Sequence, residues 1–165
     1  MALQTSGKSQ KQESLAPVYL KTALIAGTLD ILAALVHAYL SSGTTPAIVF
    51  KYIASGLFGP SAFAGGGGMI VAGLIIHYCI AFSWTLIFFL LYPKLSFLSG
   101  NIAVSAFIIG ISIWLAMRFL VLPLTAVPKS PFNPVQAVIG ALILVVMIGL
   151  PVSYFAKRYY SSQGT

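Results

Sequence analysis

A few polar side chains lie within long apolar stretches of this chain, and their types could support proton chemistry. The segment LIAGTLDILAALVHAYL carries Asp30 and, seven residues later, His37. Asp30 is one of only two acidic residues among 165. A carboxyl and an imidazole held close together inside a membrane can hold and pass a proton. Further candidate polar residues occur in three later apolar stretches: His77, Arg118 and Gln136.

A helical wheel places Asp30 on a stripe of small and polar side chains. At about 100° per residue, the residues within about 60° of Asp30 include Ala23, Gly27, Ala34, His37 and Ser41. Those about 100° or more away include Leu24, Ile25, Leu29, Ile31, Leu32, Leu35 and Val36. Small residues let membrane helices approach closely, whereas bulky apolar residues suit the lipid side. We therefore expect Asp30 and His37 to point into a helix bundle.

The depth of each polar residue indicates which ones can meet. At 1.5 Å per residue, Asp30 lies about 13 Å from the cytoplasmic side and His77 about 17 Å. His37 and Arg118 both lie at about 24–26 Å. We expect Asp30 near His77, with Arg118 near His37 or the outer lipid headgroups. A pairing of Asp30 with Arg118 stays open, although it would have to bridge an axial offset of about 13 Å.

Composition shows where the surface of the chain must lie. Hydrophobic residues make up 59% of the sequence and charged residues only 7%, against about 25% charged in soluble domains. Four stretches are long enough to cross a bilayer, which needs about 20 apolar residues. The sequence predicts an all-α membrane protein, a bundle of four transmembrane helices, with spans at about 20–41, 68–91, 101–122 and 135–156.

Two further features concern contacts between the spans. Ala106 and Gly110 form a small-xxx-small pair, which favours a close helix contact. Pro151 has no N–H for the carbonyl of Met147, so that an acceptor stays free inside the fourth span. Cys79 is the single cysteine and lies in an apolar run, where we expect a small core residue.

The rest of the chain forms tails and loops around one membrane domain, residues 19–157. We expect residues 1–18 to be a disordered cytoplasmic tail and residues 158–165 a short cytoplasmic tail. In the first loop, Thr45 can cap a helix that starts at Pro46. This helix, residues 46–58, could lie in the membrane interface with Lys51 turned to water, or pack over the mouth of the bundle.

The second loop, residues 123–134, contains four prolines and predicts a stiff, non-helical segment. The third span should therefore end before Pro123.

Basic residues indicate the orientation of the spans. With the N-terminus in the cytoplasm, six basic residues lie inside: Lys8, Lys11, Lys21, Lys94, Lys157 and Arg158. Two lie outside, Lys51 and Lys129. Positively charged loops favour the cytoplasmic side, so we expect both termini there. The net charge of +7 is spread along the flanks of the spans, which indicates contact with the lipid bilayer and no nucleic-acid partner.

Several kinds of chemistry find no support in the sequence. One cysteine excludes an intrachain disulfide or a cysteine metal cluster. Two histidines could ligate haem, but the estimated depths of His37 and His77 differ by about 7 Å, and we expect no cofactor and no metal. The HExxH and GxSxG motifs are absent, as is any carboxylate pair. We therefore do not expect an enzyme.

Loose motifs in the spans resemble a known bacterial family. They are LIAGTLD, HYCIAFSWTLIFFLLYPKL, FIIGISIWLAM with VLPL, and PFNPVQAVIGALILVVMIGLP. Together they are similar to the small four-helix inner-membrane proteins related to YagU, a family of unassigned role. The resemblance implies a bacterial cytoplasmic (inner) membrane. It transfers no functional residue, because the fourth span of that family carries further polar residues, including a histidine, whereas the corresponding region here has Gln136 and no histidine.

Two functions from different classes stay open. The first is small-solute or proton-linked transport through a polar seam made of Asp30, His37, His77, Arg118 and Gln136. The second is a non-catalytic structural or accessory subunit, in which Asp30 locks two helices together or a polar surface faces a partner. That partner could be a second copy of the chain or another membrane protein.

Overall fold

The computed structural model describes residues 14–128 and 131–163, apart from the side chain of Ser96. These residues form helices and connections without any β-strand. Four helices are long and apolar enough to cross a membrane: Leu15–Ser42, Gly67–Lys94, Ile102–Leu124 and Pro134–Ser162. The prediction of an all-α fold with four spans is confirmed, and the chain is a multi-pass integral membrane protein.

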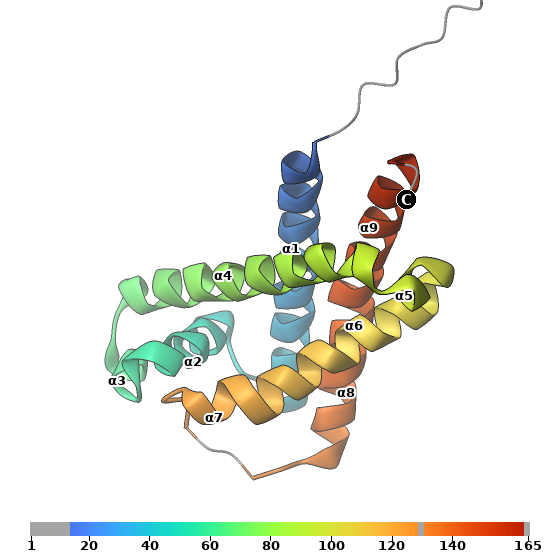
Figure 1. Ribbon diagram of the computed structural model, residues 1–165. Helices are drawn as coiled ribbons and strands as arrows, with labels where there is room; N and C mark the ends of the chain where they lie inside the picture. Colours follow the sequence, from blue (N-terminus) through green and yellow to red (C-terminus); the bar gives the residue numbers. More distant parts are fainter. Residues whose placement is uncertain (1–13, 129–130, 164–165) are drawn as a thin grey trace, which may run out of the picture.

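Figure 1 shows the four long helices and the two ends of the bundle. The spans are α1 (Leu15–Ser42), α4 (Gly67–Leu91) continued by η1 (Tyr92–Lys94), α6 (Ile102–Ala116) continued by η2 (Met117–Val121) and α7 (Leu122–Leu124), and α8 (Pro134–Leu144) continued by η3 (Val145–Gly149) and α9 (Leu150–Ser162). The start of α1 and the end of α9 lie at one end, here called the terminal end.

The opposite end, here called the loop end, holds the short connecting elements. It contains α2 (Pro46–Phe58), α3 (Ser61–Ala64), α7 and the residues that follow α7. A further short helix, α5 (Ser96–Gly100), joins η1 to α6 away from the loop end (Figure 1). Two of the spans, α4 and α6, run across α1 and the α8–α9 helix instead of alongside them (Figure 1).

Small side chains on α1 allow it to pack against α4. Ala23, Ala26 and Gly27 are buried, and a Cβ atom at Gly27 would lie 3.0 Å from the Cβ atom of Ala81. Leu24, on the opposite face, is exposed as expected for contact with lipid. Ile31 differs from the expectation, since it is only 5% exposed. The reason is that α1 contacts α4 on one side and the α8–α9 helix on the other, which widens its buried face.

The backbones of α6 and the fourth span approach each other closely at two glycines. A Cβ atom at Gly149 would lie 2.3 Å from the carbonyl oxygen of Ala106, and one at Gly110 would lie 2.4 Å from the Cα atom of Val145. The predicted small-xxx-small pair therefore does form a helix contact. Beside it, Ser153 donates a hydrogen bond to the Ser105 hydroxyl at 3.0 Å, with both side chains buried.

Each of the last two spans contains a π-helical turn shortly before a proline. Leu122, just before Pro123, donates its N–H to the carbonyl of Met117, and Leu150, just before Pro151, donates to the carbonyl of Val145. A proline ring clashes with the carbonyl four residues earlier, and the wider turn relieves that clash. The third span was expected to end before Pro123, but this turn carries it on to Leu124.

The outer bounds of the spans also differ from the expectation. The first helix begins at Leu15, so residues 15–18 of the expected tail are helical, and the fourth continues to Ser162. Residues 1–13 lie outside the described residues. Cys79, expected in the core, is exposed on α4.

The loop-end helix α2 has the predicted bounds and packs on the bundle. Its Phe50 carbonyl approaches α4 so closely that a Cβ atom at Gly73 would lie 2.0 Å from the oxygen. Lys51 is half-buried and donates to the carbonyl of Phe63 at 3.1 Å. The Gly56 carbonyl accepts the N–H of Ala126 at 3.1 Å. These contacts agree with the alternative in which this helix covers the mouth of the bundle.

Replacing Gly149 by alanine should destabilise the protein, because the added methyl group would overlap the Ala106 carbonyl. We expect a loss of about 1–3 kcal/mol in the free energy of unfolding, the usual cost of overpacking. The control is Gly100→Ala, since nothing lies within 4 Å of a Cβ atom at Gly100. Thermal unfolding of both variants in the same detergent, followed by circular dichroism, compares them. Equal melting temperatures would show that this contact does not hold the two spans together.

Candidate functional site

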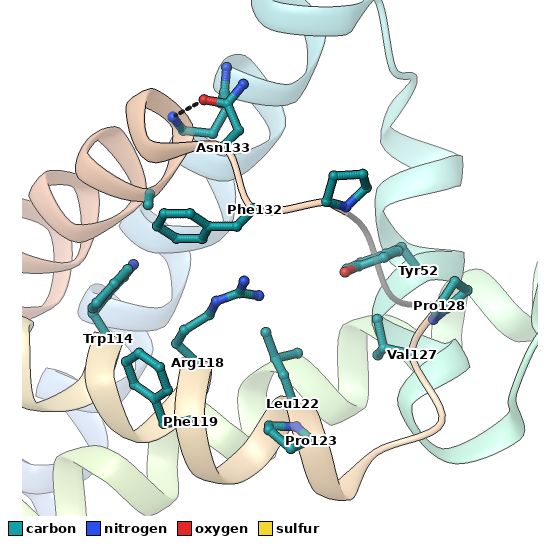
Figure 2. A pocket seen from close by; sticks show the side chains of 13 residues that line it. Tyr52, Trp114, Arg118, Phe119, Leu122, Pro123, Val127, Pro128, Phe132 and Asn133 are labelled. Atoms are coloured by element: carbon teal, nitrogen blue, oxygen red, sulfur yellow. Dashed lines mark hydrogen bonds between the residues drawn. The ribbon is translucent and has the colours of Figure 1, made fainter.

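A cavity of about 670 Å³ lies at the loop end, between the end of the third span, the start of the fourth and α2 (Figure 2). We call it the Arg118 pocket. Its lining consists of Tyr52, Trp114, Arg118, Phe119, Leu122, Pro123, Val127, Pro128, Pro131, Phe132, Asn133, Gln136 and Ala137. Most of these side chains are apolar or aromatic, and Arg118 is the only charged one.

The π-helical segment η2 places Arg118 in this pocket. The side chain is half-buried, and Figure 2 shows it extending into the space between Trp114 and Leu122. Its guanidinium carbon lies 5.2 Å from the centre of the Phe132 ring. A cation at that distance from an aromatic ring is attracted by the ring electrons. Arg118 thus has an aromatic neighbour that favours its charge without neutralising it.

His37 and Gln136 meet beside the Arg118 pocket. The Nε2 atom of His37 lies 2.5 Å from Oε1 of Gln136. Because an amide oxygen can only accept, His37 donates this hydrogen bond and the amide nitrogen of Gln136 keeps both its donors. Gln136 itself lines the pocket. The last turns of α1 are therefore connected to the pocket through a single hydrogen bond.

Tyr52 contributes a hydroxyl group from α2. Its oxygen points toward the interior of the pocket in Figure 2. Burial raises the pKa of the Tyr52 phenol above its ordinary value, and the positive charge of Arg118 opposes part of that increase. The phenol therefore stays protonated at neutral pH and can donate a hydrogen bond to a group in the pocket.

A second polar cluster lies deeper in the bundle, around His77. This side chain is 9% exposed, and its Nε2 atom lies 2.8 Å from the carbonyl oxygen of Gly27. The carbonyl can only accept, so Nε2 carries a hydrogen. In the neutral imidazole the other ring nitrogen, Nδ1, is then the one that can take up a proton.

Asp30 lies one turn along α1 from Gly27 and is half-buried. Its electrostatic partner is His77. Within the part of the chain that the structure describes, no group forms a hydrogen bond or an ion pair at contact distance with its carboxylate. Asp30 interacts electrostatically with His77, whereas Arg118 lies in the Arg118 pocket against the Phe132 ring.

The five candidate residues thus lie in two clusters. Asp30 and His77 belong to the deeper one, and the loop-end cluster contains His37, Gln136 and Arg118. The two histidines have different partners, and no group of three metal-ligating side chains occurs among residues 14–128 and 131–163.

Sequence reasoning missed the aromatic and polar side chains that surround Arg118. Trp114 and Arg118 are four residues apart on one helix and share a face, a spacing that could have been recognised. Asn133 accepts hydrogen bonds from the N–H groups of Val135 and Gln136, and an Asn-Pro start of a helix is also readable. The contribution of Tyr52 from α2 has no local signal.

Replacing Arg118 by glutamine should raise the pKa of Tyr52 further. The positive charge of Arg118 favours the phenolate, so its removal makes ionisation harder and moves it to higher pH. Tyrosine side-chain carbon NMR can follow this titration, with Tyr52→Phe to assign the signal. Lys51→Gln serves as the control, because it also removes one positive charge, but from the residue that precedes Tyr52 in the sequence. A Tyr52 pKa that falls or stays constant in Arg118→Gln would contradict the arrangement of the pocket.

Similarity to known proteins does not assign a role to either cluster. The chain matches no family model, no curated protein and no solved structure. The function therefore has to be argued from the two clusters and their place in the four membrane-spanning helices.

Proposed function

We propose that this integral membrane protein moves protons through its helix bundle in step with a small solute. Asp30 and His77 hold the proton, and the Arg118 pocket receives the solute. The observation that carries this proposal is the fixed tautomer of a buried histidine next to a carboxyl group. His77 donates to the Gly27 carbonyl at 2.8 Å, which leaves Nδ1 as the ring nitrogen that can accept a proton.

The proton step needs only these two side chains. Protonated Asp30 gives its proton to Nδ1 of His77, which produces a carboxylate and an imidazolium. The imidazolium then gives its Nδ1 proton to water on one side of the membrane and returns to the neutral tautomer with its Nε2–H still on Gly27, while the Asp30 carboxylate takes up a new proton from water on the other side. Transfer between groups that do not touch requires a rotation of the Asp30 side chain or one intervening water.

The orientation of the chain forms part of the proposal. Lys21, Lys94, Lys157 and Arg158 flank the terminal half of the spans, and cytoplasmic flanks are the more positive ones. The loop end would then face outward, with the Arg118 pocket open to solutes from outside a bacterial cytoplasmic membrane. The axial distance from His37 to Asp30, seven residues along α1, is about 10 Å, which separates the solute-binding and proton-binding sites.

The alternative, an accessory subunit in which Asp30 locks two helices together, has less support. A locking carboxylate would accept hydrogen bonds from a neighbouring helix, because an unpaired polar group in a bundle destabilises it. Among the described residues the Asp30 carboxylate makes no such contact. At this depth α1 and α4 are joined by the hydrogen bond from His77 to the Gly27 carbonyl at 2.8 Å and by one between the Thr28 and Tyr78 hydroxyls at 2.8 Å, and neither involves Asp30.

Proteoliposomes with a trapped pH-sensitive dye test the proposal. A panel of carboxylates, amines and sugars is added to the vesicles one solute at a time. With at least one of these solutes, we expect vesicles that contain the wild type to dissipate an imposed pH gradient faster than empty vesicles. Asp30→Asn and His77→Gln should both return the rate to that of empty vesicles, because neither replacement can carry the proton.

The control is Ser83→Ala, an exposed residue on α4 whose hydroxyl bonds within its own helix; it should behave as the wild type. An Asp30→Asn protein as fast as the wild type would remove the proposal. A lower melting temperature in Asp30→Asn without any proton movement by the wild type would favour the accessory subunit.

A further inference from the structure

We propose that the Arg118 pocket binds a small amphipathic carboxylate, with its anionic head at Arg118 and its apolar body against the surrounding rings. That this ligand is also the transported solute rests on the proposed function. Its binding to the pocket does not, and the two are tested separately below.

The size and lining of the pocket fit a small organic ligand. Ligand sites in proteins usually measure about 300–1,000 Å³ and combine apolar walls with a few polar groups. The Arg118 pocket has a volume of about 670 Å³, and Trp114, Phe119, Leu122 and Phe132 form much of its wall. In Figure 2 these side chains surround the guanidinium on several sides. An apolar or aromatic body therefore finds contacts next to the charge.

The charge of Arg118 determines the sign of the ligand. Asp30 is the only acidic residue that the structure describes, and its electrostatic partner is His77. Glu13, the other acidic residue of the chain, lies outside the described residues. An arginine that is half-buried without an acidic neighbour gains most from an anion, because its planar fork matches a carboxylate with two parallel hydrogen bonds.

The remaining polar groups of the pocket can also donate hydrogen bonds. Tyr52 presents a protonated hydroxyl. Gln136 keeps both donors of its amide nitrogen, because its oxygen already accepts from His37. Among the described residues, the lining holds one positive charge and additional neutral donors, which suit a monoanion better than a dianion, because a dianion would keep an uncompensated charge in an apolar site.

A carboxylate also fits the proton-binding cluster deeper in the bundle. An anion that crosses the membrane together with one proton carries no net charge, which avoids the cost of moving a lone charge through the bilayer centre. Asp30 and His77 would supply that proton. Two sources have this same chemistry: a soluble carboxylate from the aqueous side, and a fatty acid from the membrane.

Trp114 provides a direct reporter for binding. The chain has two tryptophans, Trp84 and Trp114, and Trp84 packs on Phe88, away from the pocket lining. In a Trp84→Phe background all tryptophan fluorescence comes from the pocket. We expect phenylacetate to change this fluorescence saturably in a neutral detergent. Phenylacetamide has the same shape without the charge, and it should bind about tenfold or more weakly.

Variants of the same protein identify the groups that hold the head of the ligand. Arg118→Gln should weaken phenylacetate binding about ten- to a hundredfold, the usual effect of losing a charged hydrogen-bond partner. Arg118→Lys should fall between Arg118→Gln and the wild type, because it keeps the charge and loses the fork. Lys51→Gln removes the neighbouring loop-end charge outside the pocket and should bind as the unmodified background does.

Circular dichroism melting confirms that each variant is folded. If Arg118→Gln does not fold, Gln136→Leu replaces it and should weaken binding several-fold through the loss of a neutral donor.

A second arm separates the two sources of the ligand. Oleate in phosphatidylcholine nanodiscs is compared with phenylacetate in the same nanodiscs. Binding of phenylacetate that depends on Arg118 supports an aqueous source, and binding of oleate alone with the same dependence supports a membrane source. Equal binding of phenylacetate and phenylacetamide, or no binding of either carboxylate, would overturn the inference. Neither result affects the proton measurement on Asp30→Asn, so the inference and the proposed function can fail independently.

Discussion

Close backbone contact between helices is the constraint on which the rest of this structure depends. In a bilayer, helices associate through packing and hydrogen bonding, because lipid tails are as apolar as the side chains. Gly149 lies against the backbone of Ala106, and Gly73 against the carbonyl of Phe50. The first contact joins the last two spans and the second attaches α2 to α4. A larger side chain at either glycine would separate helices that carry the polar groups.

These contacts decide which polar side chains can meet. Because α1 approaches α4 at Gly27, the carbonyl of that residue comes within hydrogen-bond distance of His77. The same approach brings Asp30 near the imidazole without direct contact. A glycine thus serves as a packing residue and as the acceptor that selects the histidine tautomer. One turn of α1, from Gly27 to Asp30, therefore carries both the packing contact with α4 and the carboxyl group of the proposed proton site.

The prolines of the last two spans shape the loop end. A π-helical turn before Pro123 relieves the clash of the ring with the preceding backbone, and Arg118 lies within that turn. An extra residue in a turn rotates the following side chains around the helix axis. The pocket is then completed by the start of α8 after the second loop and by α2. Three separate segments of the chain therefore hold one arginine among aromatic rings.

Local patterns in the sequence by themselves determined the membrane class, the four spans and the bounds of α2, because span length, apolar composition and a Thr-Pro helix start are local properties. They also identified the small stripe on α1 that carries Asp30. Tertiary structure alone decided that Gln136 meets His37, that Ile31 is buried and that Tyr52 belongs to the Arg118 pocket. Those outcomes depend on the crossing of helices and on which neighbours each face meets, and neither is encoded in the periodicity of a single helix.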